Sequence, residues 1–368
     1  METAQAQNPF TPAFGRVPPY MAGREQIISD MLQAFEGPGG DPNLSTLFVG
    51  ARGTGKTALL SYLGSEARSR GWVTADVSAV PGMLEDILQR VQTQTDELLG
   101  TDEHRRISHL EIARLGAVGW EPTPEQPGNW RTHMNRLFDR LSPLGSGILI
   151  TVDEVKPTFD EMVNLVTTYQ HFVREDRRVG LLMAGLPHNV SGLLSGSSTS
   201  FLRRACKHAL GSIPPYEVED AFRLTMEQGG RFVASDALKL AVDAIGGFPF
   251  MLQLVGYRTF NATGTRETVE IQDVARGIQS AQAELKDRVF DATLLELSKG
   301  DIAFLQAMLE DNGPSQRADL VTRLGKGTSH VSTYKKRLLE AGVIEEPRSG
   351  VFTFALPGFR EYLEEELG

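Results

Sequence analysis

Short apolar runs and helical spacings alternate over the first 213 residues, which predicts an α/β fold. The runs at residues 44–49, 147–154 and 178–187 predict strands buried in a parallel sheet. Residues 72–77 are a further strand candidate, and 209–213 is a shorter one. Helices are expected over 27–35, 58–63, 83–99 and 130–141. Period-two alternation at 107–115 predicts a β-hairpin inserted between residues 100 and 128, and the Gly- and Ser-rich stretch 191–200 predicts a loop.

The pattern changes after Pro214 and Pro215. From residue 216 to about 288 the apolar spacing is helical throughout, with residues 246–249 separating two helices. Residues 296–368 predict three short helices followed by a β-hairpin, which is the order of a winged helix-turn-helix. We therefore expect an extended segment over 1–22, an α/β domain over 23–213, a helical domain over 214–290 and a winged helix domain over 291–368.

The turn after the first strand matches a phosphate-binding loop at every position. Its residues fit the pattern Gly-x-x-x-x-Gly-Lys-Ser/Thr and are Gly50, Ala51, Arg52, Gly53, Thr54, Gly55, Lys56 and Thr57. Such a turn aims backbone N–H groups and a helix dipole at one point, which makes an anion site. Lys56 is expected to reach the β- and γ-phosphates and Thr57 to bind Mg²⁺. A chance Gly-rich turn would not also have the right strand and helix on its flanks, so the sequence predicts a nucleotide-binding P-loop NTPase.

A second motif closes the strand at 147–154. It ends in Asp153 and Glu154, at the sheet edge where open α/β sheets bind ligands. In a Walker B motif, Asp153 would belong to the Mg²⁺ shell and Glu154 would orient or polarise the attacking water. A strand that simply ends in two solvated acids is the alternative, and the complete P-loop upstream favours the functional interpretation.

Composition limits the remaining classes. No apolar run approaches 18 residues, so no membrane span is expected, and the first residues lack a secretory pattern, so a cytoplasmic location is expected. The single Cys206 excludes an intrachain disulfide and a cysteine-based zinc site. A net charge of −10 argues against wholesale wrapping of nucleic acid and leaves a local basic patch open.

Such a patch lies in the expected winged helix. The third helix is expected over about 329–341, and the basic residues on and around it are Lys326, Lys335, Lys336, Arg337 and, in the wing, Arg348. They would contact the phosphates of double-stranded DNA. Residues 296–368 nevertheless hold 9 basic and 12 acidic residues. A winged helix used for packing or for protein contacts therefore stays open.

Taken together, this order resembles the AAA+/STAND ATPases of the initiator-like, origin-recognition clade. The resemblance rests on the Gly23-Arg24-Glu25 box, both Walker motifs, a helical lid and a C-terminal winged helix, and it covers nearly the whole chain. It implies ATP as the nucleotide, hydrolysis to ADP with Mg²⁺, and an adenine pocket walled by Val17, Pro18, Pro19 and Arg24. It also implies an ATP-dependent homo-oligomer in which Arg203 or Arg204 acts as an arginine finger on a neighbouring subunit. The alternative is a pair of solvated helix-end arginines.

Two departures from that pattern favour a slow switch over fast turnover. The strand at 178–187 ends without the usual polar sensor, for which His188 or Asn189 could substitute. The lid motif Gly247-Phe248-Pro249 is followed by Phe250, where initiators carry an arginine. Three functions remain: a DNA-associated ATPase, a STAND-like signalling switch whose winged helix folds back on the nucleotide domain, and a nucleotide-stabilised adaptor with negligible hydrolysis.

Overall fold

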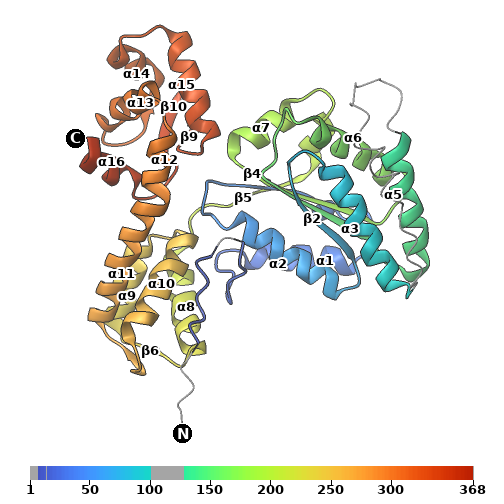
Figure 1. Cartoon of the computed structure of the whole chain (residues 1–368), viewed down its shortest axis with the longest axis horizontal. Helices are drawn as coiled ribbons and strands as arrows, with labels where there is room; N and C mark the ends of the chain where they lie inside the picture. Colours follow the sequence, from blue (N-terminus) through green and yellow to red (C-terminus); the bar gives the residue numbers. More distant parts are fainter. Residues whose placement is uncertain (1–6, 14, 101–127, 368) are drawn as a thin grey trace.

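The computed structural model describes residues 7–13, 15–100 and 128–367 (Figure 1). The hairpin expected at 107–115 lies outside these residues. Within the described ranges, no helix combines the length and the apolarity needed to cross a bilayer.

The first half of the chain forms a five-stranded parallel sheet in the order β2-β3-β4-β1-β5. Its strands are β1 (Ser45–Val49), β2 (Val73–Ser78), β3 (Ile148–Asp153), β4 (Val179–Gly185) and β5 (Cys206–Ala209). The strand β4 is buried along its whole length and β3 up to its last residue, as their unbroken apolar runs predicted. The expected P-loop NTPase sheet is therefore confirmed.

Helices cover both faces of this sheet (Figure 1). One face packs against α1 (Glu25–Glu36) and α2 (Lys56–Ser69). The other packs against α3 (Met83–Leu98), α5 (Gly128–Leu141), α6 (Asp160–Arg174) and α7 (Pro187–Ser195). Short 3-10 turns lie at η1 (Pro42–Leu44), η2 (Ser142–Leu144) and η3 (Ser200–Arg204). Side chains alternate between the two faces along β1. Leu47 packs on the face covered by α3, α5, α6 and α7, and Phe48 packs on the face covered by α1 and α2.

Two sequence expectations in this half are wrong. The first half of the loop expected at 191–200 belongs to the helix α7, which starts at Pro187 and buries Val190 and Leu193. The many Gly and Ser residues suggested a loop, although Val190 and Leu193 have the spacing of one helical face. The strand expected at 209–213 lies earlier, at β5, because it is the backbone of 206–209 that pairs with β1. As an edge strand, β5 alternates between half-buried and exposed residues and so lacks an apolar run.

The lid region follows, built from α8 (Pro215–Gln228), α9 (Ser235–Ile245), α10 (Pro249–Thr263) and α11 (Ile271–Leu285). It is not helical throughout, because the two-residue strands β6 (Phe232–Val233) and β7 (Thr268–Val269) pair in parallel. A π-helical turn, η4 (Lys286–Phe290), continues α11 into α12 (Asp291–Glu296). The boundary expected between residues 290 and 291 thus falls inside a continuous helical rod.

The winged helix region comprises three helices, a three-stranded antiparallel sheet and a terminal helix. Its elements are α13 (Lys299–Leu309), β8 (Ser315–Gln316), α14 (Arg317–Leu324), α15 (Thr328–Glu340), β9 (Ile344–Arg348), β10 (Val351–Phe354) and α16 (Phe359–Leu367). The sheet order is β8-β10-β9. The three helices and the hairpin agree with the predicted winged helix-turn-helix, to which the structure adds β8 and α16. Helix α16 buries Phe359, which packs on Phe290 of the rod at 5.2 Å between ring centroids.

The residues before α1 are anchored in the lid region. Phe10 is only 2% exposed and lies 5.7 Å from Phe222, measured between ring centroids. A Cβ on Gly256 would lie 2.1 Å from the Phe10 ring, so the glycine makes room for it. The Asn8 side-chain amide donates to the Tyr257 carbonyl at 3.0 Å. Residues 8–11 therefore tie the N-terminus to the lid before the chain returns to the sheet.

We predict that Phe10→Ala lowers the free energy of unfolding by roughly 3–5 kcal/mol, because it leaves a cavity where the ring packs against α8 and α10. Chemical denaturation followed by circular dichroism measures this change. The matched control is Phe232→Ala, since Phe232 is 62% exposed and its loss should cost at most about 0.5 kcal/mol. Equal midpoints for the two variants would show that residues 8–11 are not anchored.

Candidate functional site

The P-loop, residues 50–57, connects β1 to α2 and requires glycine at three positions. Gly53 and Gly55 have φ of 77° and 85°, a left-handed conformation that glycine adopts without strain. A Cβ on Gly50 would lie 2.6 Å from the Thr54 hydroxyl and 2.7 Å from the Leu210 carbonyl oxygen. Gly55 caps α2 without a side-chain hydrogen bond, so the first N–H groups of the helix remain available. The loop therefore offers backbone donors at a helix N-terminus, the arrangement that binds phosphate.

Lys56 lies across this loop. Its ammonium donates to the carbonyl oxygens of Gly50 at 2.9 Å and Ala51 at 2.6 Å. Burial lowers the pKa of Lys56 to about 8, against the opposing charges of Asp153 and Glu154. The group is thus a desolvated cation, and such a cation gains from an anionic partner.

Thr57 and Asp153 meet at the start of α2 and the end of β3. The Thr57 hydroxyl donates to Asp153 Oδ2 at 2.5 Å, and Asp153 Oδ1 accepts from the backbone N–H of Glu154 at 2.9 Å. The structure brings the two predicted metal ligands into contact, and both are hard oxygen donors that suit Mg²⁺. The described residues hold no group of three or more acidic, His or Cys side chains that could bind a metal. Phosphate oxygens and water would complete the coordination.

Glu154 adopts a left-handed backbone with φ of 55°, which is uncommon for a residue with a side chain. The next residue, Val155, is fixed because its N–H donates to the Ala184 carbonyl at 2.9 Å. The neighbouring strand thus holds the chain just after β3. Glu154 is exposed beside the Thr57–Asp153 pair, where a carboxylate could accept a proton from water.

Arg24 contacts the P-loop through a hydrogen bond to the backbone of Thr54. It is 7% exposed, and its guanidinium donates to the carbonyl oxygens of Gly23 at 2.7 Å, Thr54 at 3.3 Å and Gly211 at 3.0 Å. Burial lowers its pKa, and Glu217 partly offsets that effect. The sequence placed Arg24 in an adenine wall with Val17, Pro18 and Pro19, and this bracing contact was missed. Val17 and Pro19 are exposed and Pro18 is half-buried, and their contact with adenine stays a prediction.

The lid region contacts the P-loop through Phe248. A Cβ on Gly53 would lie 2.4 Å from the Phe248 ring, so the aromatic side chain packs directly on the backbone of that glycine. A Cβ on Gly55 would lie 4.0 Å from the Pro249 ring. The Gly-x-Pro motif was noted in the sequence for its missing arginine. Its packing on the phosphate loop could not be read from that spacing.

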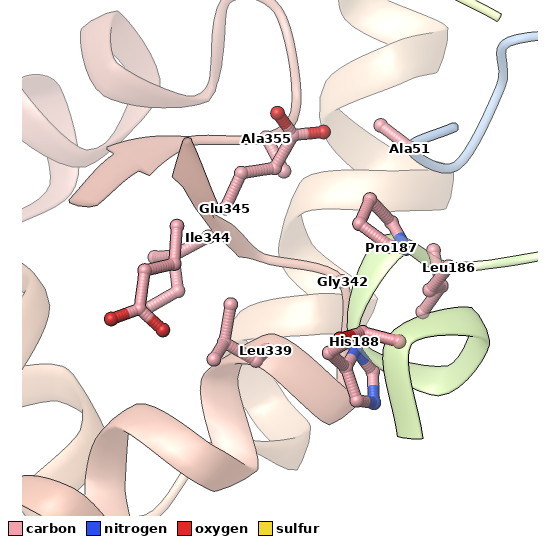
Figure 2. A pocket seen from close by; sticks show the side chains of 11 residues that line it. Ala51, Leu186, Pro187, His188, Leu339, Gly342, Ile344, Glu345 and Ala355 are labelled. Atoms are coloured by element: carbon pink, nitrogen blue, oxygen red, sulfur yellow. The ribbon is translucent and has the colours of Figure 1, made fainter. Parts of the chain in front are cut away.

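The winged helix region also reaches the P-loop. A cavity of about 230 Å³, here called the interdomain cavity, lies between the two parts of the molecule. Figure 2 shows Ala51 of the P-loop and Leu186, Pro187 and His188 at the start of α7, facing Leu339, Gly342 and Glu345 of the winged helix region. A Cβ on Gly342 would lie 3.3 Å from Leu186 and 3.4 Å from Arg52, so the two surfaces meet closely there.

His188, one of the two candidate sensors, lines this cavity. Burial lowers the pKa of His188 below its usual value, against the charge of Glu340 on α15. Its Nε2 is buried without a hydrogen-bond partner in the described part of the chain. The side chain therefore faces the winged helix, and a sensor role toward the γ-phosphate stays a prediction.

The expected arginine fingers lie away from these contacts, on η3. Arg203 and Arg204 are both exposed, and Arg203 Nε donates to the Leu194 carbonyl at 3.0 Å. A surface position is compatible with action on another subunit and with a solvated pair.

The basic residues of the winged helix divide into two sets. Lys335 pairs with Glu346 at 2.8 Å, and Arg337 pairs with Asp301 at 2.8 Å, so both hold the domain together. Lys336 is 76% exposed in its side chain and lies 3.8 Å from Glu340. Lys326 and Arg348 are also exposed. This second set is the more exposed of the two, although Lys326 also donates to the Tyr334 hydroxyl at 3.1 Å.

Comparisons with known proteins agree on the fold. A family model described as a domain of unknown function (DUF8462) matches residues 287–363, and no curated protein matches the chain. The Walker-type ATPase of Pyrococcus abyssi aligns with a TM-score of 0.67 at 14% identity, covering 94% of this chain and 96% of that one. The ADP form of the Orc2 protein of Aeropyrum pernix aligns with a TM-score of 0.55 at 16% identity, covering 96% of each chain. The fold expected from the sequence is thus confirmed over nearly the whole chain.

We predict that Lys56→Ala abolishes nucleotide binding and stabilises the nucleotide-free protein at neutral pH. Burial lowers the Lys56 pKa from 10.5 to about 8. At about 1.36 kcal/mol per pKa unit, removing the ammonium gains at most about 3 kcal/mol, reduced by the two hydrogen bonds it loses. Because the folded-state pKa is the lower one, the penalty is complete below about pH 8 and fades toward pH 10.5.

Thermal denaturation over this pH range measures the stability difference, and calorimetric titration measures nucleotide binding. Lys207→Ala, which removes an exposed lysine on β5, serves as the control and should change neither. Full-strength nucleotide binding by Lys56→Ala would refute the site.

Proposed function

We propose that the chain is an ATP-binding and slowly hydrolysing P-loop ATPase whose nucleotide state sets the position of its winged helix. The observation that supports the proposal is that the P-loop lies next to the acids that end β3 and also contacts the winged helix region. Lys56, the Thr57–Asp153 pair and Glu154 lie on one side, and Gly342 packs on Arg52 at the other. A conformational change of the P-loop on phosphate binding would therefore alter its contact with the winged helix.

Each side chain has a defined task in this scheme. The P-loop N–H groups and Lys56 would hold the phosphates, and Thr57 with Asp153 would hold Mg²⁺, which neutralises phosphate charge when bound. Glu154 would take a proton from the attacking water. Arg203 or Arg204 would reach the γ-phosphate of an adjacent copy, so assembly would be needed for full turnover. The lid brings Phe248 and Pro249 to the P-loop. Phe250 stands where initiators carry an arginine, which supports slow hydrolysis.

Of the three functions left open by the sequence, the switch has the strongest support. Two of the basic residues that would contact DNA are engaged in ion pairs within the winged helix region. Leu339 near the end of α15 and Ile344 and Glu345 at the start of β9 line the interdomain cavity, which also borders Ala51 of the P-loop. We infer that the winged helix makes its main functional contact with the ATPase domain.

The test of ATPase activity is Glu154→Gln, which should bind ATP like the wild type and lower turnover by roughly 10²–10⁴-fold, because an amide cannot accept the proton. Phosphate release and equilibrium binding measure the two effects. Glu97→Gln, an exposed acid at the end of α3, is the matched control and should keep wild-type turnover. Unchanged turnover in Glu154→Gln would mean that another group activates water.

DNA binding is a second candidate function, supported by the exposed Lys336 and Arg348. If both side chains lie on phosphates, changing them to Ala should reduce the slope of log K against log salt by about 2, since each contact contributes about 0.9. Fluorescence anisotropy with random-sequence duplexes measures the slope. Lys239→Ala, an exposed lysine on α9, should leave it unchanged. A wild type that binds no duplex at low salt would eliminate this function.

A further inference from the structure

Glu161, near the start of α6, caps the first turn of a different helix, α3. Its two carboxylate oxygens accept from the backbone N–H groups of Gly82 at 2.9 Å and Leu84 at 3.0 Å. Gly82 is the N-cap residue of α3 and has no side chain with which to cap the helix itself. One carboxylate therefore satisfies two N–H groups at a helix start, where such groups lack partners within the helix, and it ties α6 to α3.

The segment just before α3 contacts the end of β3. Ser78, the last residue of β2, lies beside Asp153 in the parallel register. The N–H of the next residue, Ala79, donates to the Asp153 carbonyl at 3.2 Å, and the Ala79 side chain is buried. Because Glu161 holds the start of α3 in place, its contact reaches the residue that precedes Glu154.

These contacts close a ring that contains Glu154. The chain runs from Asp153 through Glu154 to Glu161. The Glu161 carboxylate joins it to the start of α3, and the N–H of Ala79 joins it back to the Asp153 carbonyl. Within this ring, Glu154 has the left-handed backbone with φ of 55°. A residue with a side chain keeps such a conformation only where its surroundings fix it, and the ring supplies that constraint.

Two further contacts hold the chain between β3 and α6. The Val155 N–H donates to a carbonyl of β4 at 2.9 Å, and a Cβ on Gly192 of α7 would lie 2.9 Å from the Pro157 ring. The stretch that follows Glu154 is thus held by β4, α7 and α3. The contact with α3 is made by the carboxylate of Glu161, so a substitution can remove it without altering the backbone of the ring.

We propose that Glu161 is a positioning residue for ATP hydrolysis, which holds the Glu154 carboxylate where it can accept a proton from water. It acts through the backbone contacts of α3 and β3, so it governs turnover and leaves ATP binding to the P-loop. A misplacement of about 1 Å in a catalytic arrangement can cost roughly 100-fold in rate. This inference rests on the proposed function, because it requires that Glu154 activates water.

The test compares single-turnover hydrolysis of ATP with the dissociation constant of a non-hydrolysable ATP analogue, both with Mg²⁺. Glu161→Ala removes both hydrogen bonds and should lower the rate of hydrolysis by roughly 10–100-fold, with analogue binding unchanged. Glu161→Gln keeps one carbonyl oxygen and can accept from one of the two N–H groups, so its rate should be intermediate. In the Glu154→Gln background, Glu161→Ala should cause no further loss, because the carboxylate that it positions is already gone.

Hydrogen exchange measures the same contact in the protein without nucleotide. Glu161→Ala should speed the exchange of the amides at 153–156, followed by mass spectrometry, because the end of β3 loses a restraint. Asp41→Ala is the matched control. It removes another capping carboxylate, which accepts from the Asn43 N–H at 2.8 Å before β1, at the end of the strand opposite the P-loop. It should change neither the exchange at 153–156 nor the rate of hydrolysis.

A wild-type rate in Glu161→Ala, or unchanged exchange at 153–156, would overturn the role of Glu161 and leave the proposed function intact. An equal loss of rate in the wild-type and Glu154→Gln backgrounds would also overturn it, since the effect would then not pass through Glu154. If Glu161→Ala does not fold, the same comparisons are made with Glu161→Gln. A wild type that binds ATP without hydrolysing it would refute both the proposed hydrolysis and this inference.

Discussion

The rest of the site depends on the interaction between the buried ammonium of Lys56 and the acids around it. A cation this desolvated is costly unless anionic partners surround it, and the chain supplies them from two distant segments. Asp153 and Glu154 come from the end of β3, and Glu345 comes from the winged helix region. The two sources differ in how they are attached to the P-loop. Strand β3 is part of the same sheet, whereas β9 belongs to a region that is joined to the lid by a single helical rod.

Glycines of the P-loop and its surroundings let three other segments reach the same point. Phe248 of the lid packs where Gly53 lacks a side chain, and Gly342 of the winged helix region packs on Arg52. Arg24 donates to the Thr54 carbonyl of the loop and also to the Gly211 carbonyl, which lies in the segment that connects β5 to the lid. Because close-packed interiors leave few voids, a displacement of the P-loop would disturb each of these contacts.

Local patterns predicted the elements well. The four buried strands, the two Walker motifs and the three winged helix helices each follow from contiguous residues whose spacing reports one environment. The edge strand β5 and the helix α7 were misplaced because neither has a continuous apolar pattern. The contacts around the P-loop were not predictable, since a glycine at position 53 or 342 does not reveal which distant side chain it makes room for. The ion pairs of Lys335 and Arg337 were missed for the same reason, and they changed the interpretation of a basic stretch.

We propose that nucleotide identity moves the winged helix relative to the P-loop. Spin labels at Ser195→Cys on α7 and Gln306→Cys on α13, both exposed positions, report that separation once Cys206 is replaced by Ser. Double electron–electron resonance should give a single short distance with ADP and a longer, broader distribution with a non-hydrolysable ATP analogue. Identical distributions with the two nucleotides, in protein that binds both, would contradict the account.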